Sequence, residues 1–218
     1  MDRLNYLLEN LRDVKSFADI GCDHGKLGYD LIKNGLIEKL ILTDISADCL
    51  NKAKMLFKKM GNNVSFRCGD GIKVVEPFEV EALVISGMGA ELIYNILNFD
   101  INKTKSFRKI LLQPMTKPDL IRQFAIEKNI NIVDDAIVSE GRKFYNVIIL
   151  DTTKSYNGEE EIFFPKFLKA CTKEDVFKSY VEHNIKKLEN INKKISENSS
   201  NTEEIYKNNL LLEKWRKY

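Results

Sequence analysis

A glycine-rich turn near the amino terminus combines backbone freedom with acidic side chains. It follows a short apolar run and reads DIGCDHGKLG over residues 19–28, with glycines at 21, 25 and 28. Glycine lets the backbone bend sharply after a strand and approach a ligand closely, and a helix starting there offers free N–H groups. The glycines are not spaced as in the GxGxxG turn of dinucleotide-binding folds, because Gly21 and Gly25 are four residues apart. Asp23 inside the turn would repel a pyrophosphate.

Acidic residues also follow the next two strand-like runs. Asp44 ends the run 39–44, where a carboxylate can accept both hydroxyls of a ribose, and Asp70 follows the run 64–68, within reach of an adenine amino group. Asp23 suits the zwitterionic methionine end and the sulfonium of S-adenosylmethionine, so the three acids together predict a site for that cofactor. The expected cofactor-binding residues are Asp19, Gly21, Cys22, Asp23, His24, Asp44, Ile45, Asp70, Gly71, Ser86 and Gly87.

Two motifs after the fourth and fifth apolar runs predict where an acceptor lies. The first is Gly87-Met88-Gly89, whose glycines leave room for a target base, and the second is Gln113-Pro114-Met115. Each motif could equally be a tight turn. His24 is better explained as a hydrogen-bonding residue of its loop than as a base. The residues expected to act in catalysis are Asp23, Gly87, Met88 and Gln113.

Strand-like and helix-like runs alternate through the first 130 residues, which predicts right-handed βαβ units on a mainly parallel sheet. Strands are expected at 17–20, 39–44, 64–68, 82–86 and 109–113, and the helices among them at 3–12, 25–34, 47–60 and 118–128. The runs 132–138 and 144–150 lie too close together for a parallel crossover, so they predict an antiparallel hairpin. An α/β, Rossmann-like class I methyltransferase fold follows, with a seven-stranded, mainly parallel sheet closed by that hairpin.

The composition changes after about residue 151. Two apolar stripes recur at spacings of four and three residues on either side of the polar stretch 197–201. They predict a C-terminal antiparallel helical coiled coil, in which Asn184 would help to fix the register. The expected domains are a methyltransferase domain at residues 1–153 and a helical hairpin at 154–218.

Bulk properties narrow the class of protein. The net charge of +2 gives no global field for nucleic acid, so RNA could be held only by a local patch. The four cysteines form no metal-binding pattern, and no apolar run approaches the ~20 residues that span a bilayer. We therefore expect a cytoplasmic protein with no metal, no membrane contact and no obligatory protein partner.

With these motifs, the chain resembles the bacterial tRNA (adenine-22-N1)-methyltransferase family. The matching stretches are ADIGCDHG at 18–25, ISGMG at 85–89, LLQPM at 111–115 and EGRKFY at 140–145. Ala90 departs from the pattern, which has another glycine there. The resemblance implies transfer of the methyl group of S-adenosylmethionine to N1 of an adenine in tRNA. Its implied substrate-binding residues are Lys26, Gly89, Pro114, Met115, Arg142, Lys143 and Tyr145.

That reaction suits a site without an obvious base, because adenine N1 attacks with an in-plane lone pair. Positioning and carboxylates that stabilise the cationic product would suffice once the base is turned out of its stack; Tyr29 and Tyr145 are possible stacking partners. Two alternatives are a small-molecule methyltransferase that dimerises through its hairpin and a non-enzymatic cofactor-binding scaffold. The cations expected to hold tRNA are Lys26, Arg108, Lys109, Arg142, Lys143, Lys186, Lys187, Lys193 and Lys194.

Overall fold

The computed structural model describes residues 2–60, 63–157, 172–198 and 201–218. The chain divides into two compact units, residues 1–171 and 172–218. The division predicted from composition, between residues 153 and 154, falls earlier in the chain and stays a prediction, and part of the segment in between, 158–171, lies outside the described residues.

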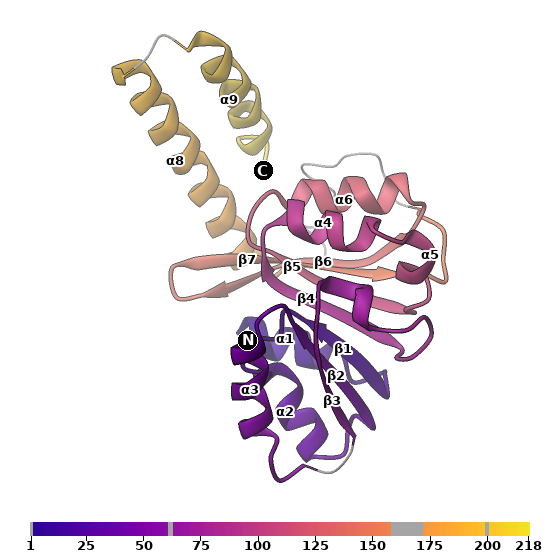
Figure 1. Cartoon of the computed structure of the whole chain (residues 1–218). Coiled ribbons are helices and arrows are strands. Elements are labelled where there is room, and N and C mark those ends of the chain that lie inside the picture. Colours follow the sequence, from indigo (N-terminus) through magenta and orange to yellow (C-terminus); the bar gives the residue numbers. More distant parts are fainter. Residues whose placement is uncertain (1, 61–62, 158–171, 199–200) are drawn as a thin grey trace. The chain divides into compact units, whose positions relative to one another are not determined.

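A seven-stranded sheet forms the first unit (Figure 1), and its strands lie in the order β3-β2-β1-β4-β5-β7-β6. The first five strands are mutually parallel, whereas β7 is antiparallel to both β5 and β6. The predicted fold class, a mainly parallel sheet closed by an antiparallel hairpin, is therefore confirmed. The strands are β1 (Ser16–Ile20), β2 (Lys39–Asp44), β3 (Val64–Cys68), β4 (Ala82–Met88), β5 (Lys109–Pro114), β6 (Asn131–Glu140) and β7 (Lys143–Asp151).

Helices cover both faces of this sheet (Figure 1), which explains why the central strands are almost wholly apolar. One face packs against α1 (Arg3–Glu9), α2 (Lys26–Lys33) and α3 (Ala47–Leu56). The other packs against η1 (Gly71–Val74), α4 (Ala90–Asn98), α5 (Ile101–Thr104) and α6 (Pro118–Glu127).

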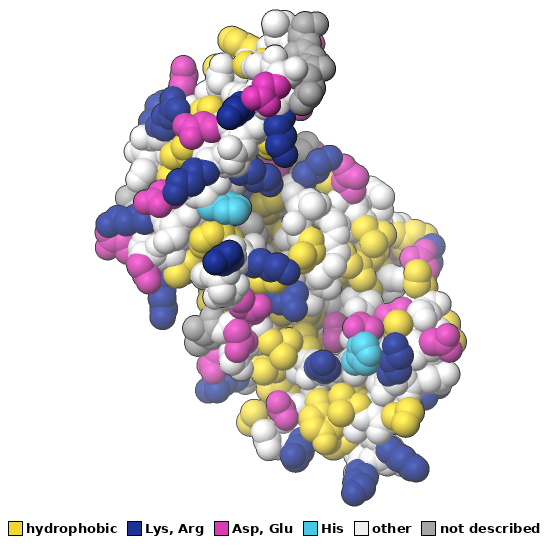
Figure 2. All heavy atoms as spheres, turned by 90° about the vertical axis from the view of Figure 1, so that its left-hand side faces the viewer, with side chains coloured by type: hydrophobic (Ala, Val, Ile, Leu, Met, Phe, Trp, Pro, Cys, Tyr) yellow, Lys and Arg dark blue, Asp and Glu magenta, His cyan; other side chains and the backbone are white. Residues whose placement is uncertain are grey.

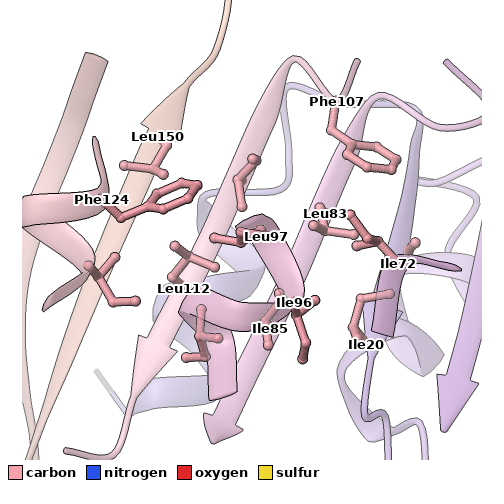
Figure 3. Close-up of a cluster of buried hydrophobic side chains, with 14 of the residues drawn as sticks. Ile20, Ile72, Leu83, Ile85, Ile96, Leu97, Phe107, Leu112, Phe124 and Leu150 are labelled. Atoms are coloured by element: carbon pink, nitrogen blue, oxygen red, sulfur yellow. The ribbon is translucent and has the colours of Figure 1, made fainter. Parts of the chain in front are cut away.

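The core beneath α4 and α6 holds the strand ends in place (Figure 3). Ile85 of β4 and Leu112 of β5 are fully buried there, together with Leu97 of α4 and Phe124 of α6. Burying one such side chain contributes roughly 1.5–3 kcal/mol. Because both faces of the sheet are packed in this way, the loops at the strand ends project from a rigid base.

Several helix ends differ from the sequence-based expectation. The first helix ends at Glu9 and the third at Leu56, each a few residues early. The predicted N-cap of α3 is confirmed, since Ser46 Oγ accepts a hydrogen bond from Cys49 N at 3.3 Å. The short helices η1 and α5 were not predicted, because four residues are too few to show a helical period.

The second unit is an antiparallel helical hairpin of α8 (Glu174–Asn198) and α9 (Thr202–Trp215). The Tyr180 and Trp215 rings meet edge to face at 5.4 Å near its open end. The predicted role of Asn184 in the register was wrong, because Asn184 Nδ2 donates to Tyr180 O in its own helix. Asn192 instead makes side-chain hydrogen bonds between the helices: its Oδ1 accepts from Asn208 Nδ2 at 2.8 Å, and its Nδ2 donates to Asn209 Oδ1 at 2.9 Å. Supercoiling of the pair stays a prediction.

None of the helices in the described part of the chain is long and apolar enough to cross a membrane. Within the same residues, no group of three or more His, Cys, Asp or Glu side chains could hold a metal ion.

Candidate active site

A cavity of about 890 Å³ lies where the parallel strands end. Its walls come from the carboxyl ends of β1, β2 and β4, from the loops after β1, β2 and β3, from residues of α1, α2, η1 and α4, and from the last residue of β6. Ligands of open α/β sheets bind at this edge, and the volume lies within the range of small-molecule sites, roughly 300–1,000 Å³.

The turn after β1 favours glycine at two positions. Gly21 has φ +69 and Gly25 has φ +68, both in the left-handed region. A Cβ at Gly21 would lie 2.0 Å from Cε of Met88, so the glycine lets that side chain lie across the turn. Gly21 N also donates to Thr43 O at 2.8 Å, which ties the turn to β2.

The carboxylate of Asp44 is held by two backbone groups. Oδ1 accepts from Ser46 N at 2.8 Å, and Oδ2 accepts from Asp23 N at 3.2 Å. Ile45 and Leu92 line the same cavity although their side chains are 76% and 51% exposed. A flat, partly apolar ligand group would remove that apolar surface from water.

Asp19 is the most deeply buried acid of the cavity. It is only 4% exposed and has no hydrogen-bond partner among the residues that the structure describes. Burial, and then the neighbouring Asp44 carboxylate, raise its pKa to about 7. The hydroxyl of Thr43, another lining residue, is buried and likewise has no partner in the described part of the chain. A cationic ligand would satisfy the Asp19 carboxylate.

Asp23 and His24 form a pair at the mouth of the turn. Nδ1 of His24 lies 2.6 Å from Oδ2 of Asp23, and this hydrogen bond lowers the pKa of the Asp23 carboxyl. The contact fits the expected role of His24 as a hydrogen-bonding loop residue. Burial, followed by the charge of Asp19, raises the pKa of the Cys22 thiol well above its usual range, so this thiol is not a nucleophile at neutral pH.

The end of β4, where a β-bulge between Ser86 and Met88 interrupts the pairing with β5, leaves open space at the cavity. Gly87 has φ +78, and a Cβ there would meet no atom within 4 Å. Gly87 N donates to Oε1 of Gln113 at 3.1 Å, and Nη1 of Arg3 donates to the same oxygen at 2.8 Å. Gln113 is fully buried and does not line the cavity, so it supports the turn from behind.

The start of α1 closes this side of the cavity. The Arg3 guanidinium lies over the Tyr145 ring, 5.0 Å from its centroid, and the Arg3 backbone N–H donates to Glu140. Asp2, Arg3, Leu4 and Glu140 all line the cavity, and sequence reasoning assigned none of them to the site. Glu140 stood at the head of the EGRKFY stretch, which was the one available signal.

The structure brings together most of the residues predicted for the site but not all of them. Tyr145 lies behind Arg3, and Tyr29 packs against Phe57 in the core at 5.5 Å. Arg108 and Lys109 stand at the other end of β5, where both contact Asp13. The predicted residues that line the cavity are Asp19, Gly21, Cys22, Asp23, His24, Lys26, Asp44, Ile45, Asp70, Gly71, Ser86, Gly87 and Met88. Those that do not line it are Gly89, Gln113, Pro114, Met115, Arg142, Lys143 and Tyr145.

Strand order and the acids at the carboxyl edge define a class I S-adenosylmethionine-dependent methyltransferase. The sequence model of the tRNA (adenine(22)-N(1))-methyltransferase family matches residues 17–215, and the chain belongs to this family. The Bacillus subtilis enzyme of that name is 30% identical over 161 residues, 72% of this chain and 68% of its own length. A putative tRNA methyltransferase of Mycoplasma pneumoniae is 31% identical over 171 residues, 76% of this chain and 78% of its own.

Solved structures share the fold over nearly the whole chain. TrmK of M. capricolum, in complex with S-adenosyl-homocysteine, superposes with a TM-score of 0.85 at 24% identity, covering 99% of this chain and 96% of its own. A putative tRNA methyltransferase of Streptococcus pneumoniae, in complex with S-adenosyl-L-methionine, gives a TM-score of 0.80 at 22% identity, covering 97% of this chain and 100% of its own.

Proposed function

We propose that this chain transfers the methyl group of S-adenosylmethionine to N1 of the adenine at position 22 of tRNA. Membership of the family supports the reaction and the substrate. The observation that carries the proposal is a single cavity in which Asp19, Asp44 and Asp70 lie on one side and the open turn at Gly87 lies on the other.

The cofactor side of the cavity fits S-adenosylmethionine group by group. Asp44, already oriented by two backbone N–H groups, would accept the ribose hydroxyls. Ile45 and Leu92 would cover the adenine ring, with Asp70 near its amino group. Asp19 would face the positive charges of the methionine end. When bound, the cofactor supplies an electrophilic methyl group on its sulfonium.

The acceptor side needs to position a base rather than to remove a proton. Adenine N1 carries an in-plane lone pair, so a general base is not required for the attack. The open space at Gly87 would admit the base, and Gln113 would hold that turn through its bond to Gly87 N. Met88 would separate the two sides of the cavity, and the ionised Asp23 would favour the cationic product electrostatically.

On the face shown in Figure 2, basic side chains are interspersed with acidic ones. tRNA would therefore be held by cations from several parts of the chain. Lys26 at the cavity, the exposed pair Arg142 and Lys143 at the β6–β7 turn, and lysines of α8 such as Lys186 and Lys187 would contact phosphates. We propose that the enzyme needs no obligatory protein partner. We place the reaction in the cytoplasm, with the tRNA.

The test is transfer of a labelled methyl group. We expect label in bulk tRNA and none in a panel of small amines and carboxylic acids. Label in the small molecules alone would favour a small-molecule methyltransferase that uses α8 and α9 to dimerise. Cofactor binding without any transfer would favour a scaffold.

A further inference from the structure

Two acids line the acceptor side of the cavity, and their oxygens differ in what they contact. Both oxygens of Asp2 are used within α1, where they accept from the backbone N and the Nδ2 of Asn5 at 2.8 and 2.7 Å. Glu140 accepts the Arg3 N–H with Oε1. Its second oxygen, Oε2, has no partner among the residues that the structure describes. Of the two acids, Glu140 therefore has the oxygen that is not yet oriented toward a donor of the described chain.

The topology of the sheet places Glu140 at the same edge as the cofactor-binding acids. β7 is antiparallel to both β5 and β6, so β6 runs parallel to β5, and its carboxyl end at Glu140 extends past the end of β5 in the same direction. Glu140 is the last residue of β6, and its strand lies on the far side of β4 from Asp44. The carboxylate thus stands beyond the open turn at Gly87, where an acceptor base would enter.

Contacts from α1 hold Glu140 in this position. Arg3 bonds Glu140 through its backbone and Gln113 through its guanidinium, and Gln113 in turn bonds Gly87 N. Farther along the same helix, Tyr6 donates to Asp134 of β6. A continuous set of hydrogen bonds therefore connects the open turn with the free carboxylate.

The Watson–Crick edge of adenine has a feature that such a carboxylate can recognise. Beside the N1 acceptor it carries the exocyclic amine, a donor, whereas an ionised carboxylate only accepts. Guanine carries a carbonyl oxygen at the corresponding position, which a carboxylate repels. Enzymes that act on an extruded base commonly read this edge by hydrogen bonds.

We propose that Glu140 is a specificity-determining residue, whose Oε2 accepts a hydrogen bond from the exocyclic amine of the target adenine; this deepens the proposed function and rests on it. During transfer the N1–C bond forms as the S–C bond breaks, and sulfur keeps the electron pair of that bond. The positive charge passes to the adenine ring and is shared with its amine, so the bond to Glu140 strengthens and no proton leaves.

The experiment compares two tRNAs, one with adenine and one with purine, which lacks the amine, at the target position. Wild-type protein should prefer adenine, and Glu140→Ala should lower kcat/KM for adenine about 10- to 100-fold, the scale of a hydrogen bond to a charged group. The same variant should leave kcat/KM for purine unchanged. Purine is intrinsically less reactive, but that difference is present in both proteins and cancels in the ratio. Glu140→Gln keeps a neutral acceptor and should lose less.

The matched control is Tyr6→Phe, which removes the hydrogen bond from the Tyr6 hydroxyl of α1 to Asp134 of β6; Tyr6 does not line the cavity. A merely structural role for Glu140 would make Glu140→Ala resemble this control, with both tRNAs affected equally. An unchanged adenine-to-purine ratio in Glu140→Ala, with normal cofactor affinity as evidence of folding, overturns the inference. If Glu140→Ala does not fold, the same comparison is made with Glu140→Gln, and an unchanged ratio there overturns it too. Wild-type protein that fails to methylate adenine tRNA overturns the proposed function, and this inference falls with it.

Discussion

Asp19 and Asp44 lie on adjacent parallel strands and line the same cavity. In the register of β1 and β2, Ile20 pairs with Thr43. Asp19 precedes Ile20 and Asp44 follows Thr43, so each acid is the direct chain neighbour of one member of this pair. Burial, and then the charge of Asp44, raise the pKa of Asp19 to about 7. Without a cation in the cavity, ionised Asp19 therefore destabilises the folded protein above that pH.

The first prediction concerns stability against pH. Asp19 binds its proton more tightly in the folded state, so its contribution is full below pH ~4 and is lost as pH rises to about 7. Asp19→Asn has no such group. The free energy of unfolding of Asp19→Asn, relative to wild type, should rise across this range by at most about 4 kcal/mol. Denaturant titrations of both proteins from pH 4 to 8 measure it.

Asp48→Asn is the control, because Asp48 is exposed on α3 and does not line the cavity. Its stability relative to wild type should show no comparable rise. Parallel pH profiles for wild type and Asp19→Asn would mean that the pKa of Asp19 is not raised in the folded protein.

The second prediction concerns cofactor affinity against pH. A cationic ligand favours ionised Asp19, so binding near pH 7 should release a proton and tighten as pH rises. The amino group of the cofactor also titrates near this range, but its contribution to proton release is the same for wild type and variant. Calorimetry in two buffers of different ionisation enthalpy should detect proton release with wild type and less of it with Asp19→Asn. Equal release from both proteins would contradict the role of Asp19.

The third prediction concerns Asp44. Asp44→Ala should weaken S-adenosylmethionine binding by roughly 2–4 kcal/mol while the protein stays folded, taking the range of charged hydrogen bonds. Part of the loss would come from the freed Asp23 N–H and Ser46 N–H, so Asp44→Asn, which keeps one oxygen, should lose less. Calorimetric titration that finds unchanged affinity in Asp44→Ala removes this residue from the site.

The fourth prediction concerns Gly87. Gly87→Val should abolish methyl transfer while cofactor binding survives, because the side chain would occupy the acceptor space and strain the turn. Gly35→Val is a matched control: Gly35 has φ +67, and a Cβ there also meets nothing within 4 Å. Both variants carry the backbone strain, ~1–2 kcal/mol, but only Gly87→Val should lose activity. Wild-type rates in Gly87→Val would place the acceptor elsewhere.

Local sequence signals were enough to predict the strands and many of the residues that line the cavity. Apolar runs closed by glycine or acid located the ends of β1 to β4, and Asp19, Asp44 and Asp70 follow directly from those ends. The acceptor side depends on contacts between distant residues, such as Arg3 with Gln113. The spacing of the leucines predicts the helix that carries Arg3, but it does not predict which strand this helix packs against.

The sequence also did not reveal the contacts that Gln113 and Asn184 make. The QPM motif lies at the end of β5 and does not line the cavity; only the tertiary structure shows that Gln113 is buried and that its Oε1 accepts from both Arg3 and Gly87. For Asn184, the stripe placed a polar residue on the hairpin seam. Its own helix offers the Tyr180 carbonyl, so it forms no contact across the seam of the kind that Asn192 makes.

The fifth prediction concerns the hairpin of α8 and α9. A chain ending at residue 171 should bind S-adenosylmethionine normally but bind tRNA more weakly, and the dependence of its tRNA affinity on salt should be shallower. Lys186→Glu with Lys187→Glu in the full chain should weaken tRNA binding in the same direction. A truncated, folded chain that binds and methylates tRNA at the full-length rate would show that these lysines only solvate the helices.

The central claim is methylation of one adenine at N1, and nucleoside analysis of the product tests it most directly. Wild-type protein is incubated with labelled S-adenosylmethionine and either a tRNA with adenine at position 22 or the same tRNA with guanine there, and each product is digested for mass spectrometry. We predict labelled N1-methyladenosine from the first tRNA and no label in the second. Equal labelling of both tRNAs, or a labelled nucleoside other than N1-methyladenosine, would contradict the account.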